Sequence, residues 1–124
     1  MKIYRYHYLV GFPTNLKKPD TNIVIKNYST HAVHASITDS YTGKIRLPKV
    51  INPRRATLIE CDAQADGTII KAVYRVAYGD VSDRRDIILV YNFEAETLVT
   101  AWLNLRSDNH TTLNSHLYDI PEGA

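Results

Sequence analysis

The feature that most constrains the fold is a series of closely spaced strand-like segments in the second half of the chain. The run from Asp86 to Phe93 (DIILVYNF) is almost continuously apolar, which is typical of a central strand covered on both faces. Further strand-like segments are Ala56 to Asp62, Thr68 to Tyr78 and Leu98 to Leu105. The connections between them are short, and short connections favour an antiparallel meander because parallel strands need long crossovers.

The first half supplies one more strand and one helix. Residues Ile3 to Val10 alternate, with Tyr4, Tyr6 and Tyr8 on one face, and so many polar tips predict a strand at a sheet edge. Residues Thr30 to Ser40 are predicted to form a short helix, because Ser29 or Thr30 can cap its start. The sequence therefore predicts one α+β domain over residues 1–124. Its short N-terminal helix would pack on an antiparallel sheet of four or more strands, with an additional N-terminal edge strand.

Composition agrees with one folded domain. The chain has 124 residues, of which 44% are hydrophobic and 23% charged, and these values are normal for globular proteins. It has no long apolar run, and its N-terminus lacks the apolar core of a signal peptide, so we expect a cytoplasmic protein without a membrane partner. The single cysteine, Cys61, lies in the apolar run ATLIEC and is expected to be a buried structural thiol.

A local basic stretch stands out on a chain whose net charge is only +2. No acidic residue occurs between Asp39 and Glu60. The basic residues of this interval are Lys44, Arg46, Lys49, Arg54 and Arg55. They indicate either a solvated loop or a surface for a phosphate backbone, and Lys44, Arg46, Arg54 and Arg55 are the candidate substrate-binding residues.

The segment from Thr97 to Tyr118 begins with a predicted strand, and a run of polar and titratable residues follows it. His110 is the first candidate for proton transfer, because imidazole titrates near neutral pH and Asp108, Asn109 and Thr112 surround it in the sequence. The alternative is a loop histidine bonded to backbone. Loops held on a rigid sheet often carry catalytic groups, so the segment favours an enzyme that acts on a phosphodiester, and we expect this substrate to be RNA.

Strand residues add further candidates. Arg75 alternates with apolar neighbours, so it must reach solvent, pair with a carboxylate or face a polar cleft. Thr100, Trp102 and Asn104 share one strand face. Trp102 either stacks on a base or belongs to the core. Tyr118 is either a stacking or proton-donating group, or an anchor of the C-terminal tail.

The remaining histidines and the absence of several motifs argue against metal-dependent and nucleotide-dependent reactions. His31 and His34 are three residues apart on the predicted helix, but a metal site needs a third ligand that the sequence does not show. We therefore expect no metal and no cofactor, and treat His31 as a catalytic or phosphate-positioning candidate. His7 and His116 are expected to be surface residues. Nucleotide-binding glycine motifs and a nucleophile-elbow motif are absent from the sequence.

Two segments resemble a known family. IVIKNYSTHAVHASITDSYTG resembles the strand and "S-x-H-A" helix of small bacterial ribonuclease toxins, and VTAWLN followed by DNHTTLNSHLY resembles their last strand and C-terminal loop. The group is the metal-independent ribonucleases of barnase, colicin-type and RelE-like architecture (the BECR fold). The resemblance implies an α+β fold with functional residues at His31, Arg75, Thr100, His110, Thr112 and Tyr118. Asn114 stands where an acidic residue is expected, and residues Ile3 to Val10 have no counterpart.

The sequence thus leads to one hypothesis and one rival. The hypothesis is a metal-independent endoribonuclease, a toxin or phage effector, that cleaves RNA by 2′-OH attack, with His110, Arg75, His31 and Tyr118 as catalytic residues. A protein inhibitor (an antitoxin or immunity protein) or a host target would be a further partner. The rival is a non-catalytic protein that binds and inhibits a partner through the exposed N-terminal edge strand.

Overall fold

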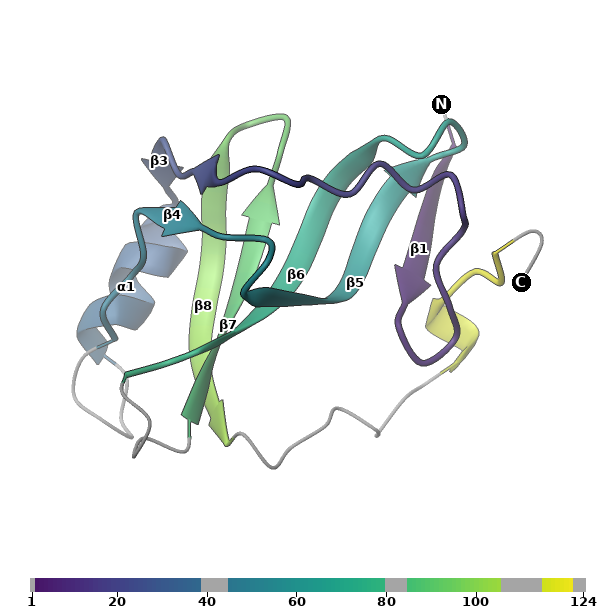
Figure 1. The fold of residues 1–124 in the computed structure, drawn as a ribbon. Helices are drawn as coiled ribbons and strands as arrows, with labels where there is room; N and C mark the ends of the chain where they lie inside the picture. Colours follow the sequence, from purple (N-terminus) through teal and green to yellow (C-terminus); the bar gives the residue numbers. More distant parts are fainter. Residues whose placement is uncertain (1, 39–44, 80–84, 106–114, 122–124) are drawn as a thin grey trace.

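The computed structural model describes residues 2–38, 45–79, 85–105 and 115–121, and these form a mostly β domain (Figure 1). The elements are β1 (Ile3–His7), β2 (Ile23–Val24), β3 (Asn27–Tyr28), α1 (Thr30–Thr38), β4 (Val50–Ile51), β5 (Ala56–Gln64), β6 (Ile69–Ala77), β7 (Arg85–Asn92), β8 (Thr97–Leu105) and the 3-10 helix η1 (Ser115–Leu117). The expected α+β class is wrong, because α1 is the single α-helix of the described residues and has only nine residues.

The main sheet has six strands in the order β1-β5-β6-β7-β8-β3. Strands β5 to β8 form an antiparallel meander, and β1 pairs antiparallel with β5 at one edge. The expectation of an antiparallel sheet is also wrong, because β3 pairs parallel with β8 at the other edge and makes the sheet mixed. A two-residue strand offers no alternation from which the sequence could predict this pairing.

Helix α1 lies along β8 and covers little of the sheet. Ser29 caps the helix, since its Oγ accepts a 3.0 Å hydrogen bond from the backbone N–H of Ala32. The same hydroxyl donates to the carbonyl of Val99 on β8, which fixes the start of the helix against that strand. Only Ala32 of the helix belongs to the buried core. The α+β prediction therefore failed because this helix packs at an edge of the sheet and does not form a layer.

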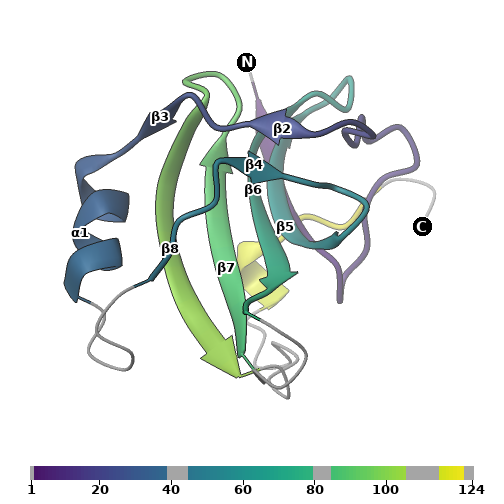
Figure 2. The same cartoon turned by 60° about the vertical axis from the view of Figure 1, so that its left-hand side comes forward.

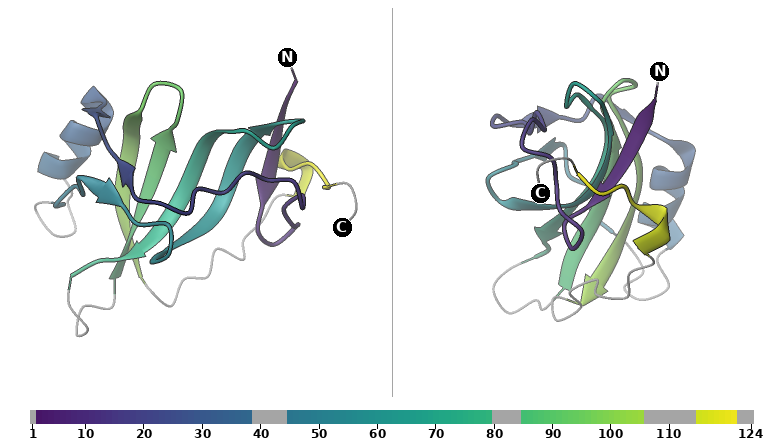
Figure 3. Two further views of the ribbon diagram at one scale, coloured as in Figure 1. Left: turned by 45° about the horizontal axis from the view of Figure 1, so that its top comes forward. Right: turned by 90° about the vertical axis from the view of Figure 1, so that its right-hand side faces the viewer.

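The layer that covers the sheet consists of extended chain. Segments around β2 and β4 cross one face of the sheet (Figure 2), and they contribute Ile23, Ile25, Ile45 and Ile51 to the core. The sheet residues beneath them include Tyr6, Cys61, Ala72, Tyr74, Leu89 and Leu98. Strand β7 is buried along almost its whole length, as its apolar run predicted. These segments lie on one side of the sheet, and α1 and η1 lie on the other (Figure 3, right).

The described ranges include no helix with the length and apolar character required to cross a bilayer. Cys61 is a free, buried thiol, as expected from the sequence. Its burial raises the pKa of the thiol to about 12, so at neutral pH it is protonated and a poor nucleophile.

Candidate functional site

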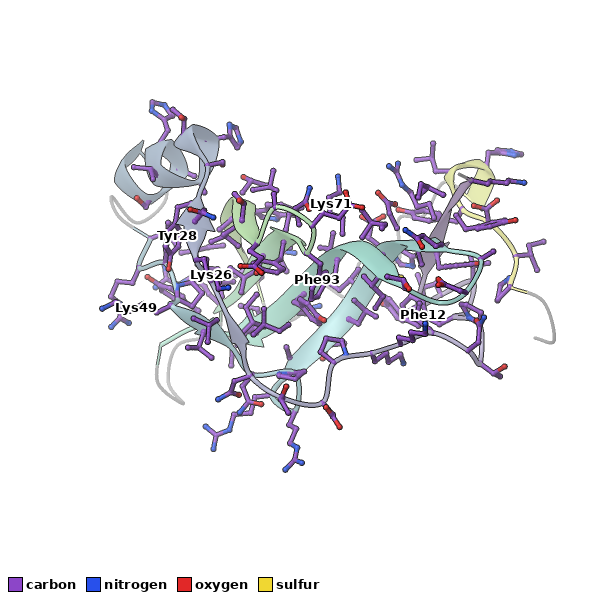
Figure 4. All side chains as sticks on the ribbon, turned by 90° about the horizontal axis from the view of Figure 1, so that it is seen from above. Phe12, Lys26, Tyr28, Lys49, Lys71 and Phe93 are labelled. Atoms are coloured by element: carbon purple, nitrogen blue, oxygen red, sulfur yellow. The ribbon has the colours of Figure 1, made fainter. Side chains whose placement is uncertain are left out.

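The sheet face opposite the core carries most of the polar side chains of the sheet, and we call it the open face. Successive strand residues point to opposite faces, so the strand register defines rows of neighbours across it. One row consists of His7, Glu60, Val73, Val90 and Thr100. The next consists of Arg5, Asp62, Lys71, Asn92 and Thr97. Figure 4 shows α1 and η1 at the two ends of this face, with Lys71 between them.

A cavity of about 190 Å³ opens in the middle of the open face. Its floor includes Val73 and Val90, and Trp102 lies at its β8 side with 42% of its surface exposed. The charged residues of its lining are Arg5, Glu60, Asp62 and Lys71. The cavity thus combines an exposed aromatic ring with cations and carboxylates.

The charges in this lining are unequally paired. The Nε of Arg5 lies 2.9 Å from Oδ1 of Asp62, and this hydrogen bond raises the pKa of the guanidinium group. Lys71 forms no ion pair with a carboxylate among the described residues. Lys71 is therefore the cation of the cavity that is available to an anionic ligand.

Glu60 lines the cavity and also lies beside Tyr118 and His7. We call these three residues the acid–base cluster. Burial and then the hydrogen bond with Glu60 raise the pKa of the Tyr118 hydroxyl, so at neutral pH this hydroxyl keeps its proton and can donate it in a hydrogen bond. The ring of His7 lies 4.9 Å from that of Tyr118, centroid to centroid. The side chain of Glu60 thus lies at the cavity wall beside the Tyr118 hydroxyl.

The prediction that His7 is a surface residue is wrong, because only 4% of this residue is exposed. Its Nδ1 accepts a 3.1 Å hydrogen bond from the backbone N–H of Leu9, so the neutral ring carries its proton on Nε2. His7 and Glu60 are partners in the β1–β5 register. Sequence reasoning missed this pair, because no pattern connects two residues so far apart in the chain.

Arg75 also lies on the open face, on β6. Its Nε donates a 2.5 Å hydrogen bond to Oδ2 of Asp86, and its terminal nitrogen donates a 3.0 Å bond to the carbonyl of Leu105. Of the three alternatives left by the sequence, the structure shows a carboxylate partner. Ile88 connects Arg75 to Trp102 in one row of the sheet, so Arg75 lies near the aromatic side of the cavity.

The predicted catalytic residues do not all converge. Tyr118 lies beside β1, whereas His31 lies on α1, which packs on β8. Four strand spacings separate β1 from β8, which corresponds to about 19 Å. His31 and Tyr118 therefore do not meet at one phosphate. Thr100 and Trp102 do share the open face, as the alternation predicted.

The other predicted binding residues lie elsewhere. Arg46 lines another cavity together with residues of β4, Arg54 and Arg55 lie in the turn between β4 and β5, and none of the three lines the cavity of the open face. Lys44, His110 and Thr112 lie outside the described residues, so their sequence-based roles stay predictions. Among the described residues, no group of three histidine, cysteine or carboxylate side chains is placed to hold a metal ion.

The rival hypothesis requires an exposed edge at β1, and the C-terminal segment covers part of this edge. Asp119 accepts a 2.8 Å hydrogen bond from the backbone N–H of Arg5, and its own N–H donates a 2.7 Å bond to the Arg5 carbonyl. Tyr6 is part of the core, and its ring is stacked at 6.2 Å on that of Tyr4. Pairing of another strand with β1 at Arg5 would thus require displacement of the C-terminal segment.

No protein-family model matches this chain, and comparisons with curated proteins and with solved structures found no similar protein.

Proposed function

We propose that the protein is a metal-independent endoribonuclease that binds RNA on the open face, a function that also fits the cytoplasmic location expected from the sequence. One observation carries the proposal: Glu60, hydrogen-bonded to Tyr118, opens onto the same cavity as Lys71 and the exposed Trp102. A proton acceptor, a cation and a stacking surface are three contributions that RNA cleavage requires.

The chemistry follows from the placement of these groups. The carboxylate of Glu60 accepts the proton of the 2′-OH as the 2′-oxygen bonds to phosphorus. The ammonium group of Lys71 stabilises the additional negative charge on the phosphorane oxygens. The bond between phosphorus and the 5′-oxygen then breaks, the departing oxygen takes up a proton, and the products are a 2′,3′-cyclic phosphate and a 5′-OH. His110 remains the sequence-based proposal for the donor of that proton.

Trp102 and Arg75 have supporting roles in this proposal. The ring of Trp102 offers an exposed surface on which a base next to the scissile phosphate stacks. Arg75 is bonded to Asp86 and to the Leu105 carbonyl, so it positions the end of β8 that carries Asn104 and Leu105. We assign Arg75 a positioning role on that basis.

The test is cleavage of total RNA and of a defined oligoribonucleotide in EDTA by wild-type protein and by Glu60→Gln. We expect EDTA-resistant cleavage with a cyclic phosphate product, reduced at least about 100-fold in Glu60→Gln, a loss typical of a removed general base. Glu94→Gln is the matched control, because Glu94 is an exposed carboxylate in the turn after β7. Absence of cleavage by folded wild-type protein would refute the proposal, and equal rates for Glu60→Gln and Glu94→Gln would refute the role of Glu60.

A further inference from the structure

The chain around β4 presents a positively charged surface whose residues do not line the cavity of the open face. Four exposed basic residues form it, and we call them the basic ridge: Arg46, Lys49, Arg54 and Arg55. Among the described residues, none of the four forms an ion pair with a carboxylate. The ridge thus has uncompensated positive charge on the side of the sheet opposite to the cavity.

The backbone of the ridge is held in place at both ends of the segment. The Ile45 N–H donates a 3.1 Å hydrogen bond to the Ser36 carbonyl of α1, and the Lys49 carbonyl accepts a 3.0 Å bond from the Ile25 N–H. The hydroxyl of Tyr28 donates to the Pro48 carbonyl at 2.6 Å. Figure 4 shows Lys26, Tyr28 and Lys49 close together at this end of the molecule.

The second half of the ridge has its own anchors. A turn at Asn52 accepts hydrogen bonds from the N–H groups of Arg54 and Arg55, each at 3.0 Å. Ile51, beside this turn, is almost completely buried. The cations are therefore carried by a segment that is already ordered, so a ligand loses less conformational entropy on binding than with a flexible basic loop.

An aromatic ring lies at one end of the ridge. The guanidinium groups of Arg46 and Arg85 each lie 5.5 Å from the centroid of the Tyr78 ring, within cation–π range. The Tyr78 hydroxyl accepts a 3.0 Å hydrogen bond from the Arg46 N–H. A second cavity of about 190 Å³ adjoins this ring, and Pro48 and Asn52 contribute to its lining. Its described lining contains no acidic residue.

From this arrangement we infer that the basic ridge is a second RNA-binding surface, which holds the phosphate backbone of the substrate on the side of the sheet opposite to the cleavage site. Guanidinium groups, an aromatic ring and ordered backbone are the features with which proteins bind single-stranded nucleic acid. The inference rests on the proposed function. It adds that the enzyme prefers RNA long enough to reach both faces over a short oligonucleotide.

The experiment compares two triple variants of equal charge. Arg46→Gln/Arg54→Gln/Arg55→Gln removes three cations of the ridge, and Lys2→Gln/Lys17→Gln/Lys18→Gln removes three exposed cations elsewhere. Fluorescence anisotropy at several salt concentrations measures binding of a labelled 2′-O-methyl RNA, which lacks the free 2′-OH and is therefore not cleaved. The RNA has about 20 nucleotides, a length beyond the usual site of one small domain. Cleavage of a tetranucleotide, measured in parallel, reports on the open face alone.

We expect the ridge variant to bind the long RNA about tenfold more weakly and to cleave the tetranucleotide at the wild-type rate. Loss of three phosphate contacts reduces the slope of log K against log salt by about 2. The control variant is expected to remain within about twofold of wild type in binding, since scattered exposed cations contribute little.

Two results overturn the inference without affecting the proposed function: equal binding losses in both variants, or unchanged long-RNA binding by the ridge variant. The second result would point to another anionic ligand, such as an acidic protein surface. If wild-type protein neither cleaves nor binds RNA, the proposed function and this inference fail together. Circular dichroism and thermal unfolding of both variants verify that a loss of binding does not arise from a loss of structure.

Discussion

Asp86 accepts a 2.5 Å hydrogen bond from Nε of Arg75, and this pair connects β7 to β6 on the open face of the sheet. The Asp86 residue is only 5% exposed, and the side chain of Arg75 is also largely covered. Charges in such a position are stable because each has the other as a partner. Removal of one of them takes the ion-pair partner from a largely buried charge.

We therefore predict that Asp86→Asn lowers the free energy of unfolding by about 2–4 kcal/mol. The double variant Arg75→Met/Asp86→Leu should be less destabilised than Asp86→Asn, because it leaves no charge behind. Urea denaturation of the wild type, of Asp86→Asn and of the double variant measures both values. A double variant at least as destabilised as Asp86→Asn would contradict this account of the pair.

The turn between β5 and β6 depends on Gly67. Its φ is +89°, and a Cβ at this position would lie 2.1 Å from the carbonyl oxygen of Asn15. The loop before β2 packs here, with the Lys17 N–H donating a 2.9 Å hydrogen bond to the Gly67 carbonyl. A side chain at residue 67 would therefore strain the backbone and also displace the loop.

We predict that Gly67→Ala lowers the free energy of unfolding by at least about 2 kcal/mol. Gly11→Ala is the matched control, since Gly11 also has a positive φ, of +121°, but its Cβ would lie 3.4 Å from the Pro121 side chain. The control should cost about 1 kcal/mol, from the backbone conformation alone. Chemical denaturation of the two variants tests this difference, and equal losses would show that the contact with Asn15 is unimportant.

These elements show how much of the fold the sequence could predict. The meander from β5 to β8, the buried strand β7 and the Ser29 cap follow from alternation, apolar runs and capping preferences, all of which are local. The parallel pairing of β3 with β8 and the covering of the sheet by extended chain depend on contacts between distant segments. Those contacts have no local signature, so the α+β class was predicted wrongly.

In the candidate site, too, features with a local sequence pattern were predicted and contacts between distant segments were not. The alternation of β8 placed Thr100 and Trp102 on one face, and the structure shows them there. Glu60, Lys71 and His7 were not predicted, because they converge only when β1, β5 and β6 are brought into register. An alternating strand indicates which side chains share a face. It does not indicate which strands lie next to each other.

The buried hydroxyl of Tyr74 has no hydrogen-bond partner among the described residues. A buried polar group without a partner is unfavourable by about 1–3 kcal/mol. We predict that Tyr74→Phe leaves the free energy of unfolding at pH 7 unchanged or raises it by up to about 1 kcal/mol. Urea denaturation at pH 7 measures this change. A loss above about 1 kcal/mol would mean that the hydroxyl has a partner in the folded protein.

Alkaline pH should destabilise the protein through the buried thiol of Cys61. Burial raises its pKa from 9.0 to about 12. The folded state thus holds this proton more tightly than the unfolded state, so its contribution is complete below pH 9 and is lost as the pH rises towards 12. We predict that the stability of wild type falls over this interval more steeply than that of Cys61→Ala. Denaturation curves at successive pH values give the two slopes, and parallel slopes would contradict the assignment.

Trp102 provides the most direct test of the open face as an RNA-binding surface. Its ring is 42% exposed on β8 beside the cavity, so its truncation should remove contact with ligand at little cost to the core. Stacking of one base on an aromatic ring contributes about 1–3 kcal/mol, so Trp102→Ala should weaken RNA binding by about 5-fold to 150-fold. Trp102→Phe keeps an aromatic ring and should retain most of the affinity.

Ile120→Ala is the matched control, because Ile120 is a more exposed apolar residue outside the cavity. Anisotropy titrations with a short single-stranded 2′-O-methyl RNA, which the enzyme cannot cleave, measure all three affinities. Unchanged affinity in Trp102→Ala would place the RNA on another surface of the protein.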